Sequence, residues 1–447
     1  MFGNIYKFYL SSSKNIKKLI IFNIIKMLLN IKGKQYDLTN FNHPGGTEIL
    51  ELSKNEPDCT ALFESYHAFC DMEKIKKQMK IYEVKDSKYD EMFSFENDGF
   101  YNIVKQKVIS YFESKMNKKI QRNDIKANLN WILVSLCQVI LFIYAQYQLL
   151  FSTFFLSRII FGFISGFILV GIGFNVLHDS SHYALSVKPI INNLFSYITQ
   201  SIVFWNHILW SYHHIIRHHQ YTGMLEYDPD MRHSMPFLRK SSQFQIKPLT
   251  FSKKFLIIKL LLFNCIFPGS FIGQALSYHI VWIRKGKIWK MKLPDLYSFI
   301  NSIGQYFISI SFLSLMIYYA GFYTLFHLIG MNIMYFFSIA PDHDLFSSHL
   351  ETENFDKNKK MDWGEQQVRA SANFCTKSLF ITRFAGGINY QIEHHLFPSL
   401  NNVYLSEIAP IVKQSCQEFN IPYNSIENPK DVFNELCKTY LDAYKNY

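Results

Sequence analysis

The chain lacks charge over two long stretches. From Ala127 to Leu177, 51 positions, the only charged residue is Arg158, and from Leu296 to Pro341, 46 positions, there is none. A spanning helix needs about 20 consecutive apolar residues, so each stretch is long enough for two helices joined by a turn. This excludes a wholly soluble chain and predicts membrane spans over about 129–149, 157–177, 297–318 and 321–341.

Cysteine is scarce, and no two cysteines form a metal-binding or redox pair. The seven cysteines are scattered over 447 residues without a CxxC motif. The spacing therefore suggests neither a disulfide framework nor a cysteine-ligated zinc site. Cysteines without disulfide partners are compatible with a protein that faces the reducing cytosol.

Acidic residues are outnumbered, with 35 Asp and Glu against 46 Lys and Arg and a formal net charge of +11. In a chain with long apolar runs, we interpret this positive charge as attraction to anionic membrane lipid and not to nucleic acid. We therefore expect no nucleic-acid partner. The turns between the paired spans, around 148–158 and 318–324, carry one basic residue, whereas the opposite side is rich in Lys and Arg. The positive-inside rule therefore predicts that both termini and the long middle loop are cytosolic.

Two further apolar segments are interrupted. The stretch KKLIIFNIIKMLLN at residues 17–30 contains Lys26 and is followed by no small-residue cleavage site, which indicates an amphipathic leader. The run Leu260–Ile283 is uncharged over 24 positions and could be a fifth span. Pro268 and Gly269 in its middle favour an interfacial or re-entrant pair of short helices instead.

Histidines concentrate in three short boxes, which hold seven of the 16 in the chain. The boxes are HxxxH with His178 and His182, HxxxHH with His214, His218 and His219, and QxxHH with Gln391, His394 and His395. An i, i+4 pair on a helix faces one direction, so HxxxH can offer two imidazoles to one metal. Imidazole suits iron, zinc or copper, and a single zinc site takes about four ligands, so seven histidines indicate two ions. Neutral imidazoles offset little metal charge, so such ions can activate dioxygen.

The boxes, together with HHQYTGMLEYDPD, DWGEQQVRASANF and GGINYQIEHHLFP, resemble those of the membrane fatty-acid desaturases over nearly the whole chain. The resemblance implies two non-haem irons, bound by the box histidines, with Gln391 at the catalytic site. Glutamine in the third box is typical of the front-end subgroup. The family also uses a histidine after the last span, for which His343 in PDHD is the match and His349 a weaker candidate. We expect packing or supporting roles for His207, His213 and His327.

An N-terminal module resembles cytochrome b5. It contains NFNHPGGTEIL and FESYHAF, followed by KIKKQMKIYEV. The resemblance implies a haem b with His43 and His67 as axial ligands, and Gly45 and Gly46 would allow a tight turn beside the porphyrin. Two protein ligands leave the iron no open position for dioxygen, so this haem should carry electrons.

Acidic residues lie between the two haem-ligand positions. They are Glu48, Glu51, Glu56, Asp58 and Glu64. We expect them either to dock the haem module on the basic body or on a basic reductase, or to be ordinary surface acids.

The predicted fold is mainly α, with a small α+β cytochrome b5-like domain followed by a four-span helical membrane body with a cytosolic histidine-rich cap. The domain covers residues 30–85, a linker 86–126, the desaturase body 127–425 and a tail 426–447. In the linker, Phe100, Ile103, Val104, Val108 and Phe112 predict an amphipathic helix, packed on the body or lying at the interface.

The resemblance implies a front-end desaturase of Δ5 or Δ6 type, acting on polyunsaturated acyl-lipid or acyl-CoA with O2. Electrons would come from NADH or NADPH through cytochrome b5 reductase and the fused haem. We expect a multi-pass protein of the endoplasmic reticulum membrane, with the metal site in the cytosol. The alternatives are a sphingolipid long-chain-base desaturase, a lipid hydroxylase, and a non-catalytic haem electron carrier or lipid-binding protein.

Overall fold

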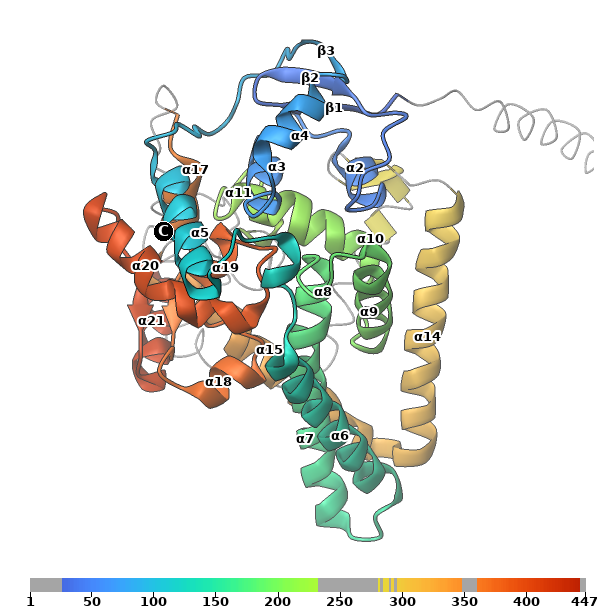
Figure 1. Cartoon of the computed structure of the whole chain (residues 1–447). Coiled ribbons are helices and arrows are strands. Elements are labelled where there is room, and N and C mark those ends of the chain that lie inside the picture. The colour runs from blue at the N-terminus through green and yellow to red at the C-terminus, as the bar shows by residue number, and fades with distance from the viewer. Residues whose placement is uncertain are drawn as a thin grey trace, which may run out of the picture.

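The computed structural model describes residues 26–231, 280–281, 284–288, 291–292, 296–347 and 360–442. Helices dominate, and the largest sheet lies in the N-terminal domain, so the predicted mainly α fold with a small α+β domain is confirmed (Figure 1). Most of the predicted leader, residues 260–279 of the third apolar run and His349 lie outside the described residues.

The N-terminal domain combines three strands with three short helices. Its elements are β1 (Leu28–Ile31), β2 (Lys34–Asp37), β3 (Glu83–Asp86), α2 (Glu48–Ser53), α3 (Thr60–Tyr66) and α4 (Met72–Met79). The strands pair antiparallel in the order β1-β2-β3, and Lys32 and Gly33, both with positive φ, turn the chain between the first two. A small core that includes Leu29, Tyr36 and Leu50 holds the sheet on the helices.

The linker helix is α5 (Phe100–Met116). Its side chains Phe100, Val104, Val108 and Phe112 are buried in the largest apolar cluster of the described residues, which also contains Phe397. The helix therefore packs on the histidine-rich part of the chain. This is one of the two arrangements predicted from the sequence, packing on the body as opposed to lying at the membrane interface.

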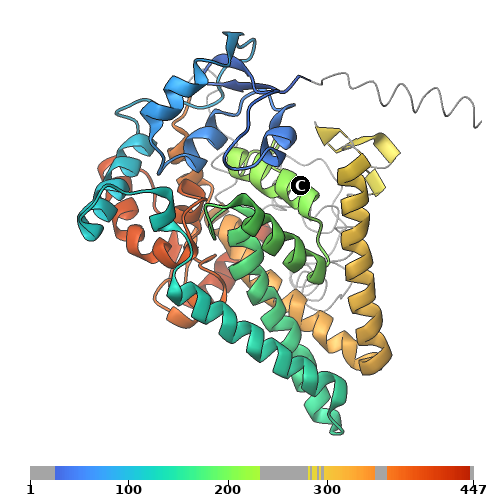
Figure 2. The same ribbon diagram turned by 45° about the vertical axis from the view of Figure 1, so that its right-hand side comes forward.

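Four long apolar helices form two pairs. They are α6 (Leu129–Phe151), α7 (Phe155–Ile172), α14 (Leu296–Ala320) and α15 (Thr324–Asp344). Figures 1 and 2 show α6 and α7 as a hairpin that projects away from the N-terminal domain, and α14 turning back into α15 at its far end. Among the described residues, three helical stretches are long and apolar enough to cross a membrane: Arg122–Phe151, Phe155–Ser181 and Ser302–Asp344. The third covers most of α14 and all of α15, so four spans remain a prediction.

The helices α7 and α15 cross at two glycines. A Cβ atom on Gly166 would lie 1.9 Å from the backbone oxygen of His327, and one on Gly330 would lie 2.1 Å from that of Phe163. Small residues at such a crossing let two backbones approach closely in a membrane. The contact ties the two helical pairs together.

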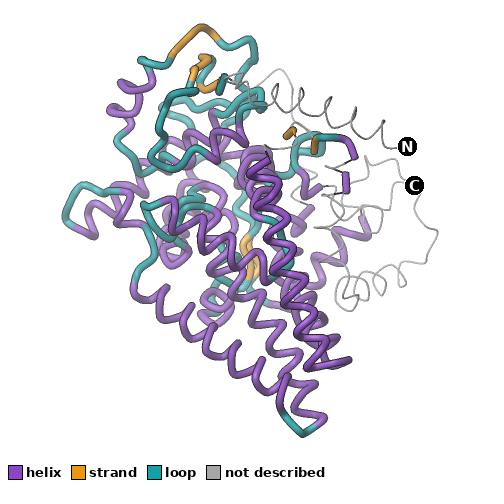
Figure 3. The backbone as a smooth tube through the Cα atoms, turned by 90° about the vertical axis from the view of Figure 1, so that its right-hand side faces the viewer, coloured by secondary structure: helices purple, strands orange, loops and turns teal. Residues whose placement is uncertain are grey.

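The remaining elements are mostly helices joined by loops (Figure 3), and some of them carry the histidine boxes. The first box lies on η2 (Gly173–His178) and α8 (Asp179–Ser181), the second on η3 (Ser211–His218) and α11 (His219–Tyr221), and the third on α19 (Gln391–Leu396). The surrounding elements are η1 (Arg122–Ile125), α9 (Pro189–Ile202), α10 (His207–Trp210), η4 (Pro229–Met231), β4 (Lys287–Ile288), β5 (Met291–Lys292), η6 (Gly321–Tyr323), η7 (Leu345–Ser347), α17 (Trp363–Arg369), β6 (Asn373–Phe374), α18 (Leu379–Phe384), η9 (Asn402–Tyr404), α20 (Leu405–Glu418), β7 (Ser425–Ile426) and α21 (Pro429–Asp442). Both η2 and η3 are π-helical, a form that recurs at functional sites.

Candidate active site

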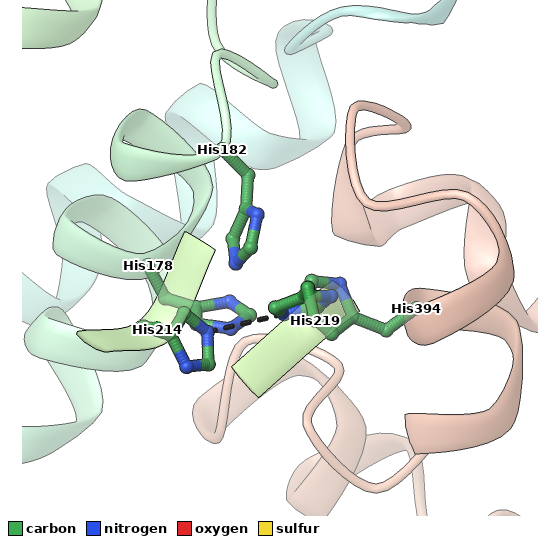
Figure 4. A group of neighbouring side chains, drawn as sticks. All are labelled: His178, His182, His214, His219 and His394. Atoms are coloured by element: carbon green, nitrogen blue, oxygen red, sulfur yellow. Dashed lines mark hydrogen bonds between the residues drawn. The ribbon is translucent and has the colours of Figure 1, made fainter. Parts of the chain in front are cut away.

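Five histidines from all three boxes converge at one point. They are His178, His182, His214, His219 and His394, and one nitrogen of each lies within 4.8 Å of the corresponding nitrogens of the others. Figure 4 shows His394 reaching from the C-terminal part of the chain to the rings of the first two boxes. All five side chains are buried. We call this set the five-histidine group.

A second set comprises His218, His343 and His395, again with their ligand atoms within 4.8 Å of one another. We call it the three-histidine group. Each member has its Nδ1 beside an oxygen: a carboxylate oxygen of Asp228 at 3.1 Å, the backbone oxygen of Ala370 at 2.9 Å and Gln367 Oε1 at 2.9 Å, respectively. These oxygens accept a hydrogen bond from Nδ1–H, so the ligand lone pair of each ring is on Nε2.

The short distances between imidazole nitrogens indicate a cation site. His218 Nε2 lies 3.0 Å from His343 Nε2, and His219 Nε2 lies 3.2 Å from His394 Nε2 and 3.3 Å from His214 Nε2. Lone pairs aimed at one point repel unless a positive charge lies between them. The eight histidines therefore fit two metal ions with imidazole ligands, the chemistry that suits iron.

Burial favours the neutral ligand form of most of these rings. Burial, and then the neighbouring imidazoles, lower the pKa values of His214, His219, His394 and His395 well below the ordinary range. His218 differs: burial lowers its pKa, but Asp228 and Asp230 outweigh burial and raise the pKa to about 9. A carboxylate partner of this kind makes an imidazole a more basic ligand.

The π-helical turn explains how the second box divides. His214 and His219, five residues apart, join the same group because a π-helix brings positions i and i+5 together. His218 lies in the three-histidine group instead. The adjacent His394 and His395 divide in the same way, whereas His178 and His182 stay together as their i, i+4 spacing predicts.

Gln391 lies at the three-histidine group. Its amide nitrogen is 3.0 Å from His343 Nε2 and 3.2 Å from His395 Nε2. Its oxygen is buried without a hydrogen-bond partner among the described residues. Rotation of the amide about its last bond brings the oxygen, the atom that binds cations, to the same place.

Three other histidines serve elsewhere. His207 contacts Glu48 at 3.0 Å, His213 pairs with Asp230, and His327 lies 2.8 Å from Ser165 Oγ between α7 and α15. None belongs to either histidine group of the described residues, in line with the supporting roles expected for them.

Sequence reasoning did not assign the residues that orient the ligands. Asp228, Gln367 and Thr222 hold His218 and His395 in place. Asp228 stands in YDPD, nine residues after the last histidine of the second box, and Gln367 stands in DWGEQQ. Their acceptor roles depend on tertiary contacts.

The N-terminal domain holds a second candidate cofactor site. The ring centroids of His43 and His67 are 6.0 Å apart, the span that two imidazoles need when they bind one iron from opposite sides at about 2 Å. Their Nδ1 atoms lie beside the backbone oxygens of Gly46 and Phe63, at 3.0 and 2.8 Å. Each Nε2 is therefore free for a metal.

The space between these histidines suits haem. A cavity of about 950 Å³ is lined by both rings and by apolar side chains, and Arg122 in its wall supplies a positive charge for the carboxylates of a haem. Burial lowers the pKa of His67 to about 4, which keeps the ring neutral. A Cβ atom on Gly45 would lie 2.7 Å from His43 Cε1, and Gly46 has a φ of +93°, so both positions require glycine.

Three of the acidic residues between the haem-ligand positions face the rest of the chain. Glu48 contacts His207, Glu56 pairs with Arg217 at 2.7 Å, and Glu64 pairs with Lys105 at 2.9 Å. Of the other two, Glu51 pairs with Lys54 and Asp58 bonds Thr60 within the domain. The acidic side of the domain is therefore used for docking on this chain.

Comparison with known proteins is consistent with both sites. The family model described as Fatty acid desaturase matches residues 153–427, and the one described as Cytochrome b5-like Heme/Steroid binding domain matches residues 23–86. The "Acyl-lipid (8-3)-desaturase" of Physcomitrium patens is 30% identical, covering 88% of this chain and 83% of that protein. A Mortierella alpina protein of the same name is 27% identical, covering 93% and 92%. The "Probable Delta(5) fatty acid desaturase C" of Dictyostelium discoideum is 25% identical, covering 94% and 91%.

Proposed function

Because the chain belongs to the fatty acid desaturase family and carries a cytochrome b5-like domain, we propose that it is a front-end acyl-lipid desaturase of Δ5 or Δ6 type. Such an enzyme adds a double bond between an existing one and the carboxyl end of a polyunsaturated chain. The names of the relatives, acyl-lipid and Delta(5) desaturases, support an acyl-lipid substrate over acyl-CoA.

The observation that carries the proposal is the pairing of the two histidine groups beside a docked haem pocket. Desaturation removes two hydrogens from unactivated methylenes, which needs dioxygen and two electrons. Two irons held by imidazoles would supply the oxygen chemistry, and a haem with two axial histidines would supply electrons one at a time. Asp228, Gln367 and the backbone of Ala370 keep the three-histidine group oriented, and burial of all eight rings excludes bulk water.

The electron supply and the location complete the proposal. Cytochrome b5 reductase, using NADH or NADPH, would reduce the haem. The desaturase family and the long apolar helices indicate a membrane protein. We place it in the endoplasmic reticulum membrane, and the positive-inside pattern supports a cytosolic side for both termini and the histidine groups.

Expression in a yeast that lacks polyunsaturated acids tests the reaction. The cells are fed 18- and 20-carbon polyenoic acids, and mass spectrometry locates any new double bond. A bond on the carboxyl side of an existing one, absent with His395→Ala at equal protein level, supports front-end desaturation. Unchanged fatty acids in cells whose protein holds iron would contradict it. A change in the long-chain bases would then favour the sphingolipid alternative, and a new hydroxyl group would favour a hydroxylase.

A further inference from the structure

The haem pocket and the five-histidine group meet at one residue of α3. Tyr66 is the last residue of this helix and immediately precedes His67. Its hydroxyl oxygen lies 2.6 Å from His182 Nδ1. Its ring is nearly parallel to the imidazole of His182, at 16° and a centroid distance of 6.1 Å. A residue of the haem-binding domain thus hydrogen-bonds a member of the five-histidine group.

His67 and His182 each have their Nε2 atom available for a metal. His67 uses Nδ1 to donate to Phe63, which leaves Nε2 for the haem iron. His182 Nε2 has no hydrogen-bond partner among the described residues and lies among the nitrogens of the five-histidine group. With that lone pair on the metal, the Nδ1–H of His182 donates to the oxygen of Tyr66.

Tyr66 also lines the haem cavity. It shares the wall of this cavity with His67, and with Tyr183 and Ile215 from the histidine-bearing part of the chain. The cavity therefore lies between the two parts, and Tyr66 both lines this cavity and contacts His182. The ion pair of Glu56 with Arg217 fixes the domain in this position.

We propose that Tyr66 is the residue that couples the haem electronically to the desaturase centre, through His67, the intervening backbone, the phenol ring and the hydrogen bond to His182. This rests on the proposed function of the chain. A route of covalent bonds and one short hydrogen bond couples two metals better than an open gap of the same length. Tyr66 touches neither substrate nor metal in this role. It acts through His182, which it holds by a hydrogen bond, and so it is a positioning residue.

The desaturation reaction balances in electrons and atoms when electrons take this route. With haem held by His43 and His67 and iron held by the histidine groups, each passage would take one electron from ferrous haem and deliver it to a ferric iron of the histidine groups. Two passages supply two electrons, and water supplies two protons. The acyl chain gives up two hydrogens, each with its electron, and O2 leaves as two molecules of water. Reduced pyridine nucleotide, through a reductase, restores the ferrous haem.

The test is Tyr66→Phe in the full chain, purified with haem and non-haem iron. The haem is reduced, excess reductant is removed, and the protein is mixed with oxygenated buffer and polyunsaturated phospholipid while haem absorbance reports reoxidation. We expect reoxidation to slow by on the order of 10-fold or more. The haem spectrum, haem content and iron content should match those of the unmodified protein.

Two controls separate coupling from mere support of the fold. Tyr36→Phe changes another tyrosine of the haem-binding domain, one buried in its small core, and should leave the reoxidation rate unchanged. A small-molecule reductant that bypasses the haem should give Tyr66→Phe the same product yield as the unmodified protein.

Each other outcome overturns the proposal in a recognisable way. An unchanged reoxidation rate in Tyr66→Phe shows that electrons take another route. Loss of iron from this variant shows that Tyr66 only holds a ligand. If the haem of the unmodified protein is not reoxidised faster with substrate and iron than without them, haem does not feed the centre at all, and the proposed function fails with it.

Discussion

Glu56 of the haem-binding domain and Arg217 of η3 form a buried ion pair, with Glu56 Oε2 2.7 Å from Arg217 Nη1. Tyr212 also donates its hydroxyl proton to Glu56 Oε1, at 3.0 Å. Arg217 lies between His214 and His218, so the pair fixes the haem-binding domain on a helix that carries one member of each histidine group.

Loss of this pair should loosen the domain. Glu56→Gln leaves the buried guanidinium of Arg217 without a counter-charge, which typically costs about 3 to 5 kcal/mol. We expect a lower temperature of thermal unfolding and faster proteolysis between the domain and α5. Glu73→Gln, which breaks the exposed pair with Lys76, is the control and should change neither. Equal behaviour of the two variants would contradict a docking role.

Stability should depend on pH through Glu64. Burial raises the pKa of this carboxyl, but Lys105 and Lys32 outweigh burial and hold the pKa below its ordinary value of 4.5. A lowered folded-state pKa stabilises the protein above the unfolded-state pKa, and this contribution is lost as pH falls through the folded-state pKa. We expect Glu64→Gln to destabilise the protein by roughly 2 kcal/mol at pH 7. The difference between variant and unmodified protein should shrink below about pH 4.5 in thermal melts, and a difference that stays constant with pH would count against this ion network.

Removal of a haem-ligand residue should separate the two cofactor sites. His43→Ala removes one axial ligand, so we expect loss of the haem absorbance and of desaturation with NADH or NADPH. The non-haem iron content should remain, because His43 is in neither histidine group. Full activity in the absence of separate cytochrome b5 would contradict the fused domain as electron donor.

We expect Gln391 to affect the binding of one iron ion only, the one at the three-histidine group. Its amide lies at the three-histidine group, so Gln391→Ala should weaken iron binding there by about 10- to 100-fold and leave the five-histidine group loaded. Titration with a chelator, followed by iron analysis, should show one easily removed iron per chain. Gln414→Ala, an exposed amide beside Glu418, is the control. Loss of both irons together would show that the groups do not bind independently.

The crossing of α7 and α15 should tolerate no side chain. Gly166→Ala places a carbon where the backbone oxygen of His327 already lies, and overpacking of this kind costs about 1 to 3 kcal/mol. We expect a lower unfolding temperature in detergent. Gly173→Ala, whose new carbon would meet Val203 at an ordinary 3.8 Å, should unfold near the original temperature. Similar melting of both variants would contradict tight packing at the crossing.

The fold was predictable where the signal is local. Absence of charge predicted the apolar helices, and the spacing from Phe100 to Phe112 predicted α5, because helical periodicity is a property of neighbouring residues. The division of the histidines was not predictable. His214 and His219 share a group because η3 is π-helical, and nothing in the spacing of HxxxHH distinguishes a π-turn from an α-turn.

Contacts between distant segments could not be predicted from the sequence either. Asp228 reaches His218 over ten residues, and Tyr66 reaches His182 over 116. The acidic residues between the haem-ligand positions left two interpretations open, docking on a basic partner or an ordinary surface role. The choice of Arg217 and Lys105 depends on how the two parts pack, which no local pattern records.

The docking of the haem-binding domain has a consequence for how electrons arrive. Glu56 and Glu64 face the rest of the chain, whereas α4, which lines the haem cavity from the other side, has no buried residue. Under the proposed function, a reductase would meet the haem at α4 while the contacts at Glu56 stay closed. The domain would then be a fixed relay and not a diffusing shuttle, so the supply of electrons would depend on a single encounter, that with the reductase, and not on the abundance of a free carrier.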